Sequence, residues 1–288
     1  MIYLFFSIIC SVSVGVLFKI CKKNKNFAFF QMIAWNYFFA GGLSYWIYKP
    51  DFNLEGSTIP GFLFVTLIVL LPSVFLIQAN SVKYAGIVRT DIAQRLSLII
   101  SLSAAYLIFK ETFSSLKIAG LFLGFISIFL ILSGKSTESV SGKWQYPVIV
   151  PIGFGVIDVL FKKVALFKGF SYTTSLFIIF SGAFIISLII ILFQIITRKQ
   201  KFSIQNIYWG AGLGLLNFGN ILFYLKAHQV LHNNPSTVFA CMNFGVIILG
   251  SFVGIFFFKE KMSKRNYFGL SLALIAILLI AISQIQSP

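Results

Sequence analysis

The stretch FKETFS at residues 109–114 recurs as FKEKMS at residues 258–263, and this repetition decides how the chain is arranged. The same offset of 149 positions carries Gly120 to Gly269, and an apolar run precedes each copy of the motif. Internal similarity at so long a spacing indicates two related halves rather than a chain of short repeats. The sequence therefore predicts one architectural unit that is used twice.

The composition places both halves in a membrane. Of the 288 residues 58% are hydrophobic and only 10% are charged, and the mean hydropathy is +0.94. Soluble chains carry roughly a quarter charged residues. A membrane-spanning helix needs about 20 mostly apolar residues, and ten stretches meet this length. We expect an all-α integral membrane protein with transmembrane helices at about 2–20, 27–48, 60–80, 86–109, 115–134, 147–166, 171–197, 206–226, 235–258 and 266–284.

The number of spans in each half predicts the symmetry. Five is odd, so a second copy that follows directly lies upside down in the membrane. We expect two inverted five-helix repeats, residues 1–134 and 147–288, joined by a connecting loop at 135–146. Secondary transporters are commonly built in this way, with the substrate near the midplane between the halves. The pattern therefore favours a transporter that works by alternating access.

The doubled Phe-x-Glu-x-x-Ser motif, each copy placed before a Gly-containing last helix, resembles the drug/metabolite transporter superfamily, in particular its EamA-type branch. That family usually has Gly before the Glu, whereas this chain has Lys110 and Lys259. Its members are permeases for amino acids, sugars, nucleotide sugars, phosphorylated metabolites or drugs, and most bacterial members export. The resemblance implies an exporter in the bacterial inner membrane, surrounded by the lipid bilayer, and it does not single out a substrate.

Arg95 is the residue most expensive to keep in lipid. It lies near the middle of span 86–109, where a charge costs roughly 2.5–3.5 kcal/mol and so normally faces the protein interior. Asp91 stands one turn earlier, so one alternative is an ion pair that anchors the helix. The other is a guanidinium that receives an anionic group of the substrate. The second alternative favours an anionic or zwitterionic metabolite, such as an amino acid.

Several uncharged polar residues also lie within the spans. The repeat offset places Asn243 on Gln94, and a polar stripe at i, i+3 and i+7 follows one face of span 206–226. Each amide either lines the pathway or hydrogen-bonds a neighbouring helix. Our predicted substrate site consists of Arg95, Gln94, Asn217, Asn220, Tyr224 and Asn243.

Asp158 is a second acid inside a span, and Lys162 follows it at i+4. An acid within the membrane can relay protons, which makes proton coupling one hypothesis. An acid paired with a cation instead stays ionised. The spacing favours the ion pair.

Chemistry other than transport finds little support in the sequence. His228 and His232 have the spacing of a zinc-protease helix, but Gln229 stands where the catalytic Glu is needed. The three cysteines form no CxxC pair. We expect no enzymatic activity, no metal and no cofactor. The alternatives to a transporter are an intramembrane enzyme and a membrane scaffold without transport activity.

Three Gly-x-x-x-Gly pairs, which begin at Gly120, Gly210 and Gly250, predict surfaces where helices approach closely. These surfaces serve either contacts within the chain or a homodimer. The spacing favours contacts between helices of the chain, and a homodimer is the alternative.

The net charge of +16 would suggest a nucleic acid in a soluble protein, but here it follows the connections between spans. The connections after odd-numbered spans hold 15 of the 23 Lys and Arg. We therefore expect no nucleic-acid partner. The positive-inside rule places that side in the cytoplasm and both termini outside, whereas the family resemblance implies both termini inside.

Overall fold

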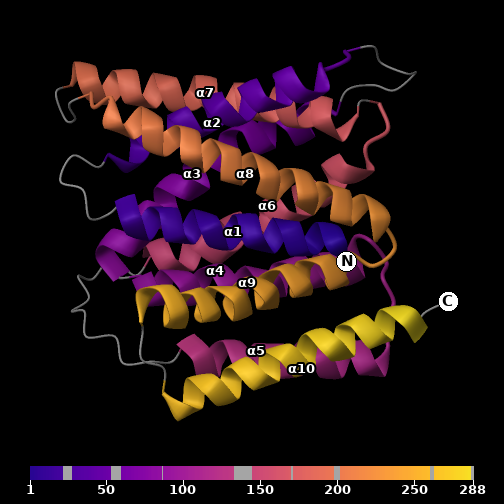
Figure 1. Cartoon of the computed structure of the whole chain (residues 1–288). Helices are drawn as coiled ribbons and strands as arrows, with labels where there is room; N and C mark the ends of the chain where they lie inside the picture. Colours follow the sequence, from indigo (N-terminus) through magenta and orange to yellow (C-terminus); the bar gives the residue numbers. More distant parts are fainter. Residues whose placement is uncertain are drawn as a thin grey trace.

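Ten helices make up the described part of the computed structural model, which comprises residues 1–21, 28–52, 60–85, 87–132, 145–169, 171–197, 202–259 and 263–286. Each helix coincides with one predicted span, with ends that differ by a few residues. The helices are α1 Ile2–Cys21, α2 Phe29–Tyr48, α3 Gly61–Ala85, α4 Ile87–Leu107, α5 Ser115–Leu132, α6 Gln145–Leu166, α7 Tyr172–Ile196, α8 Gln205–Val230, α9 Pro235–Phe258 and α10 Lys264–Gln286 (Figure 1).

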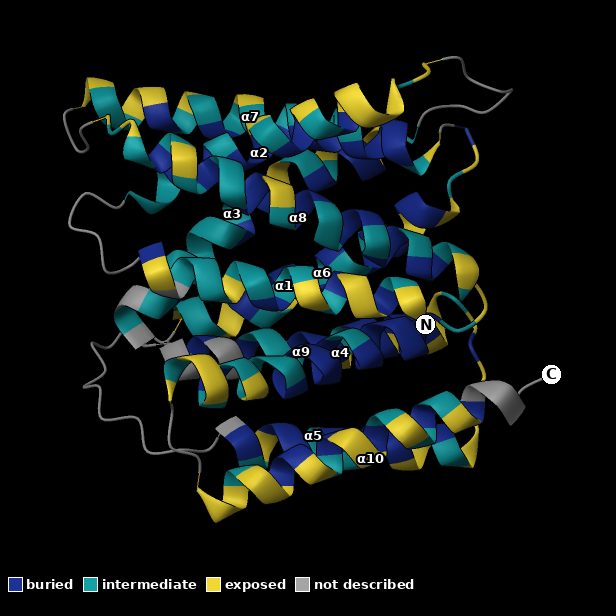
Figure 2. Cartoon of the chain, in the orientation of Figure 1, coloured by how far each residue is buried: buried dark blue, intermediate teal, exposed yellow. Residues whose placement is uncertain are grey.

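The outer surface of this bundle is apolar. Figure 2 shows exposed residues along the outer helices α7 and α10, whereas much of α9 is buried. Trp46, Phe62 and Phe257 are 82%, 87% and 80% exposed, which a protein surrounded by water would not tolerate over many positions. Within the part of the chain that the structure describes, four helices are long and apolar enough to cross a membrane by themselves, namely Gly61–Val82, Tyr172–Ile196, Pro235–Phe258 and Lys264–Ser283. The chain is therefore a multi-pass membrane protein.

Helices of the first half pack mainly on helices of the second half. α1 contacts α8 and α9, α2 contacts α7 and α8, α3 contacts α6 and α7, and α4 contacts α6 and α9. α5 and α10 lie against each other below the rest of the bundle (Figure 1). Both termini lie at the same end, as an even number of crossings requires (Figure 1). The two halves thus interleave and do not form separate bundles.

Glycines let α8 approach α2 closely. A Cβ atom on Gly210 would lie 2.3 Å from Cβ of Trp35, and one on Gly214 would lie 2.7 Å from the carbonyl oxygen of Asn36. These distances leave no room for any side chain at either position. The predicted close-packing surface that begins at Gly210 is confirmed.

The repeat-related glycines Gly120 and Gly269 do the same for the pair formed by α5 and α10. A Cβ on Gly120 would lie 2.9 Å from Ile280, and one on Gly269 would lie 2.8 Å from Ile131. By contrast, a Cβ on Gly250 would meet no atom within 4 Å. The expectation of a close contact within the chain was wrong at Gly250, because that face of α9 points to open space.

Three helix ends carry a lysine with positive φ: Lys49, Lys110 and Lys259. Lys110 follows α4 and Lys259 follows α9, so the two occupy equivalent places in the doubled motif. A left-handed residue commonly ends a helix, and glycine is the usual choice because it has no Cβ to clash. At its start, α9 begins with Pro235, whose fixed φ suits the first helical turn.

Candidate functional site

Asp158 of α6 brings three helices together. Ser101 of α4 donates its hydroxyl to Oδ2 of Asp158 at 3.0 Å, and Tyr224 of α8 donates to Oδ1 at 3.1 Å. Hydrogen bonds to a charged acceptor are stronger than bonds between neutral groups. A carboxylate within the membrane is thereby stabilised by donors from both halves of the chain.

Arg95 and Asn243 add a fourth helix to this cluster. Nη1 of Arg95 donates to Oδ1 of Asn243 on α9 at 3.5 Å, and Nδ2 of Asn243 donates to the carbonyl oxygen of Phe239 at 3.0 Å. The guanidinium also attracts the Asp158 carboxylate electrostatically. The cluster formed by Arg95, Ser101, Asp158, Tyr224 and Asn243, hereafter the polar cluster, thus presents one positive and one negative group.

The ion pair expected between Asp158 and Lys162 does not form. Nζ of Lys162 instead donates to the carbonyl oxygens of His228 at 3.2 Å and His232 at 2.8 Å. The last carbonyl groups of a helix lack partners within the helix and carry partial negative charge, so they attract a cation. Because the oxygens of Asp158 are occupied by neutral donors and the lysine reaches the end of α8, the i, i+4 spacing gave the wrong partner.

The other predicted site residues contact neighbouring helices. Oε1 of Gln94 accepts a bond from Nε2 of Gln78 on α3 at 2.8 Å, and Oδ1 of Asn220 accepts one from Ser7 on α1 at 2.8 Å. Asn217 is buried, and no hydrogen bond joins its side chain to the described residues. The side chain of Asp91 lies outside the described part of the chain. Tyr224, Arg95 and Asn243 thus reach the polar cluster, whereas Gln94 and Asn220 join α4 to α3 and α8 to α1.

The sequence reasoning placed neither Ser101 nor His228 near the predicted site. Ser101 lies seven residues after Gln94, on the same helical face, so an extended polar stripe on α4 would have indicated it. His228 is fully buried between the rings of Tyr224 and Phe239, with centroid distances of 4.7 and 4.8 Å. Among the described residues neither of its ring nitrogens has a hydrogen-bond partner. Its proximity to Tyr224 follows from the i, i+4 spacing.

The doubled motif has a structural role that its sequence did not reveal. Oε1 of Glu111 accepts from Nζ of Lys117 at 2.7 Å and from the hydroxyl of Ser236 at 2.5 Å, while Oε2 accepts from the backbone N–H of Ser236 at 2.8 Å. Nζ of Lys117 also donates to Oδ1 of Asn234 at 3.0 Å. The motif of the first half therefore caps the first turn of α9, a helix of the second half. Glu260, its repeat counterpart, lies outside the described residues.

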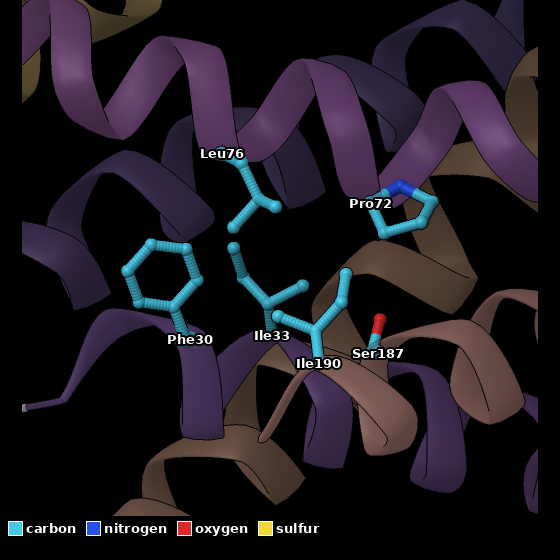
Figure 3. Close-up of a pocket in the computed structure, with 6 residues that line it drawn as sticks. All are labelled: Phe30, Ile33, Pro72, Leu76, Ser187 and Ile190. Atoms are coloured by element: carbon cyan, nitrogen blue, oxygen red, sulfur yellow. The ribbon is translucent and has the colours of Figure 1, made fainter. Parts of the chain in front are cut away.

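An apolar crevice between α2, α3 and α7 lies apart from this chemistry. Its volume is about 10 Å³, roughly the space of one water molecule. The hydroxyl of Ser187, its polar lining group, is bonded to the carbonyl oxygen of Ala183. The crevice is too small for a metabolite, and Figure 3 shows its lining by Phe30, Ile33, Pro72, Leu76, Ser187 and Ile190.

Interleaved membrane helices around a half-buried acid and a half-buried arginine are the architecture of a membrane transport protein. Residues 1–133 match the model of the EamA-like transporter family. The first half of the chain therefore belongs to this family and hence to the drug/metabolite transporter superfamily, which confirms the resemblance found in the sequence.

Two further similarities cover nearly the whole chain. A Haemophilus influenzae protein, described as uncharacterized, is 43% identical over 286 residues, which covers 95% of each chain. A crystal structure of a protein that is 11% identical superposes with a TM-score of 0.74, covering 100% of this chain and 98% of the other. The second similarity, at so low an identity, shows a shared fold.

Proposed function

We propose that this chain is a secondary transporter that moves a small zwitterionic metabolite, such as an amino acid, across the membrane by alternating access. The observation that carries the proposal is the polar cluster, in which Arg95 and Asp158 place opposite charges among helices of both halves. Such groups are costly in a membrane and are typical of substrate pathways. A purely structural anchor would not require polar side chains from four helices.

The chemistry of the polar cluster fits a zwitterion. The guanidinium of Arg95 suits a carboxylate, which it can bind through two parallel hydrogen bonds. The carboxylate of Asp158 suits an ammonium group, and the hydroxyl of Tyr224 and the amide of Asn243 supply further polar contacts. Asn217 is buried on α8, seven residues before Tyr224, and we include it in the proposed substrate site.

The packing of the helices supports two inverted repeats. Exchanging each helix with the one five places further on converts the contact between α1 and α8 into that between α6 and α3. The same exchange converts α4 with α6 into α9 with α1, and it leaves the pair α5 with α10 unchanged. A two-fold relation between the halves lets one conformational change close one end while opening the other.

We extend the proposal to export through the bacterial inner membrane and to coupling with protons. Asp158 is the acid that would carry the proton, since it lies inside a span and accepts bonds from two neutral hydroxyls. Binding of the proton and of the substrate ammonium group at the same carboxylate would exclude each other. Such competition is a direct way to couple an outward flow of substrate to an inward flow of protons.

The test begins with purified protein and a set of metabolites grouped by charge. A ligand that binds the folded state raises the thermal midpoint by mass action. We expect zwitterions to raise the midpoint, and the best of them to be taken up by proteoliposomes. The Arg95→Ala variant should remain folded and monodisperse but lose both binding and uptake. Wild-type uptake by this variant would refute the assignment of Arg95 to the substrate.

A further inference from the structure

We infer that the network of Glu111, Lys117, Asn234 and Ser236, hereafter the latch, holds closed the end of the protein at which both termini lie and must open during transport. The inference rests on the proposed alternating access. Four crossings separate the N-terminus from the connection that carries Glu111, and eight separate it from the turn that carries Asn234. Both latch segments therefore lie at the end of the termini (Figure 1).

The latch crosses the boundary between the two halves. Glu111 and Lys117 belong to the connection after α4 and to the start of α5, whereas Asn234 and Ser236 belong to the start of α9. Three hydrogen bonds of 2.5 to 3.0 Å join the two segments, and the Glu111–Lys117 ion pair at 2.7 Å lies within the first of them. Any separation of the halves at this end must break the bonds to Asn234 and Ser236.

Burial makes the latch strong and selective. The side chains of Lys117 and Glu111 are 0% and 1% exposed, and a buried charge that loses a partner is strongly disfavoured. When closed, the carboxylate of Glu111 has both oxygens bonded and faces the positive end of α9. When this end of the protein opens, water must replace the lost partner of each latch group. The network therefore distinguishes sharply between a closed and an open end.

The opposite end has different chemistry. The repeat offset of 149 positions relates Lys117 to Asn266, Ser236 to Ile87 and Asn234 to Ala85. The counterparts of Lys117, Ser236 and Asn234 thus lack the ammonium, hydroxyl and amide groups of the latch. The counterpart of Glu111 is again an acid, Glu260. Asn266 is half-buried, and its Oδ1 accepts a bond from the hydroxyl of Ser263 in its own turn. In the absence of substrate, the end away from the termini should open more readily.

A distance measurement across the latched end tests this inference without any substrate. Thr112 and Asn233 are exposed on the two latch segments, so nitroxide labels at Thr112→Cys and Asn233→Cys report their separation by pulsed electron resonance. The three native cysteines are first replaced by alanine, and the thermal midpoint of this background is checked. We expect one short distance in the parent and, in Lys117→Gln, an added longer distance with at least a fivefold larger population.

Matched variants separate the latch from a general loss of stability. Lys163→Gln makes the same change at an exposed position of α6 and should leave the single distance unchanged. Ser236→Ala removes one donor, and it serves as the milder variant if Lys117→Gln does not fold. An unchanged distance distribution in the folded latch variants would overturn the inference. Because no substrate takes part, that outcome would leave the proposed transport function standing.

Discussion

Lys110 and Lys259 hold the same unusual backbone conformation, with φ of 55° and 52°, at equivalent positions in the two copies of the doubled motif. This agreement explains why the family usually has glycine there, because glycine adopts positive φ without a steric penalty. Lysine keeps the turn but at a cost of roughly 1 kcal/mol. The two copies of the motif thus share one backbone geometry, with lysine at the position of positive φ in each.

Replacing either lysine by glycine should stabilise the protein. We expect Lys110→Gly and Lys259→Gly each to raise the stability of the folded state by about 1 kcal/mol, because the strain at positive φ is relieved. Thermal unfolding of purified protein in detergent measures the effect as a higher midpoint. Lys163→Gly, at an exposed position within α6, is the control and should lower stability by about 0.5–1 kcal/mol. A lower midpoint for both motif variants would contradict this explanation.

Removing the charge of Asp158 should stop transport without unfolding the protein. In Asp158→Asn the amide still bonds Ser101 and Tyr224 but no longer attracts a cation, so uptake by proteoliposomes should fall at least about tenfold. If protons bind this carboxylate, uptake by the variant should also no longer respond to an imposed pH gradient. A variant that transports and still responds to the gradient would exclude Asp158 as the coupling group.

The hydroxyl of Tyr224 should matter through its bond to Asp158. Tyr224→Phe removes the donor at 3.1 Å, and since a hydrogen bond to a charged group contributes about 1.5–3 kcal/mol, uptake should fall about tenfold or more. Tyr208→Phe makes the same change at an exposed position on α8 and should be neutral. Equal activity in the two variants would remove Tyr224 from the site.

The contact between α8 and α2 should tolerate no side chain at Gly214. A Cβ there would lie 2.7 Å from the carbonyl oxygen of Asn36, so Gly214→Ala must push the helices apart and should cost about 1–3 kcal/mol. Gly42→Ala, where a Cβ would meet no atom within 4 Å, should leave the thermal midpoint unchanged or higher. A neutral Gly214→Ala would show that the helices are packed less tightly.

A reporter fused to the C-terminus decides the orientation of the chain. The positive-inside rule predicts an external C-terminus, because the connections after odd-numbered helices hold most of the Lys and Arg. The family resemblance predicts an internal one. Activity of a reporter that works only in the cytoplasm would refute the prediction from charge, and it would also place the latch on the cytoplasmic side.

The sequence predicted the helices well because length and hydropathy are local properties. All ten predicted spans are helices, and the glycine pair that begins at Gly210 forms the predicted close contact, between α8 and α2. The partners of polar residues were harder to predict. Spacing fixes the face on which Lys162 lies, but the reach of its side chain to the carbonyl groups of α8 depends on how two helices cross. The bond from Ser236 to Glu111, between residues far apart in the sequence, carries no sequence signal at all.

The interleaving of the helices affects how the protein is made. α5 finds its main contact in α10, and α1 and α2 find theirs in α7, α8 and α9. At a synthesis rate of about 5–20 residues per second, roughly 10 to 30 seconds pass between completion of the first five helices and arrival of the last. Until α9 arrives Glu111 lacks its bonds to Ser236, and until α10 arrives Gly120 of α5 lacks the helix against which it packs. The first five helices therefore lie in the bilayer before their contacts with the second half can form. Proteins that assist membrane insertion can bind the exposed helix surfaces in this interval.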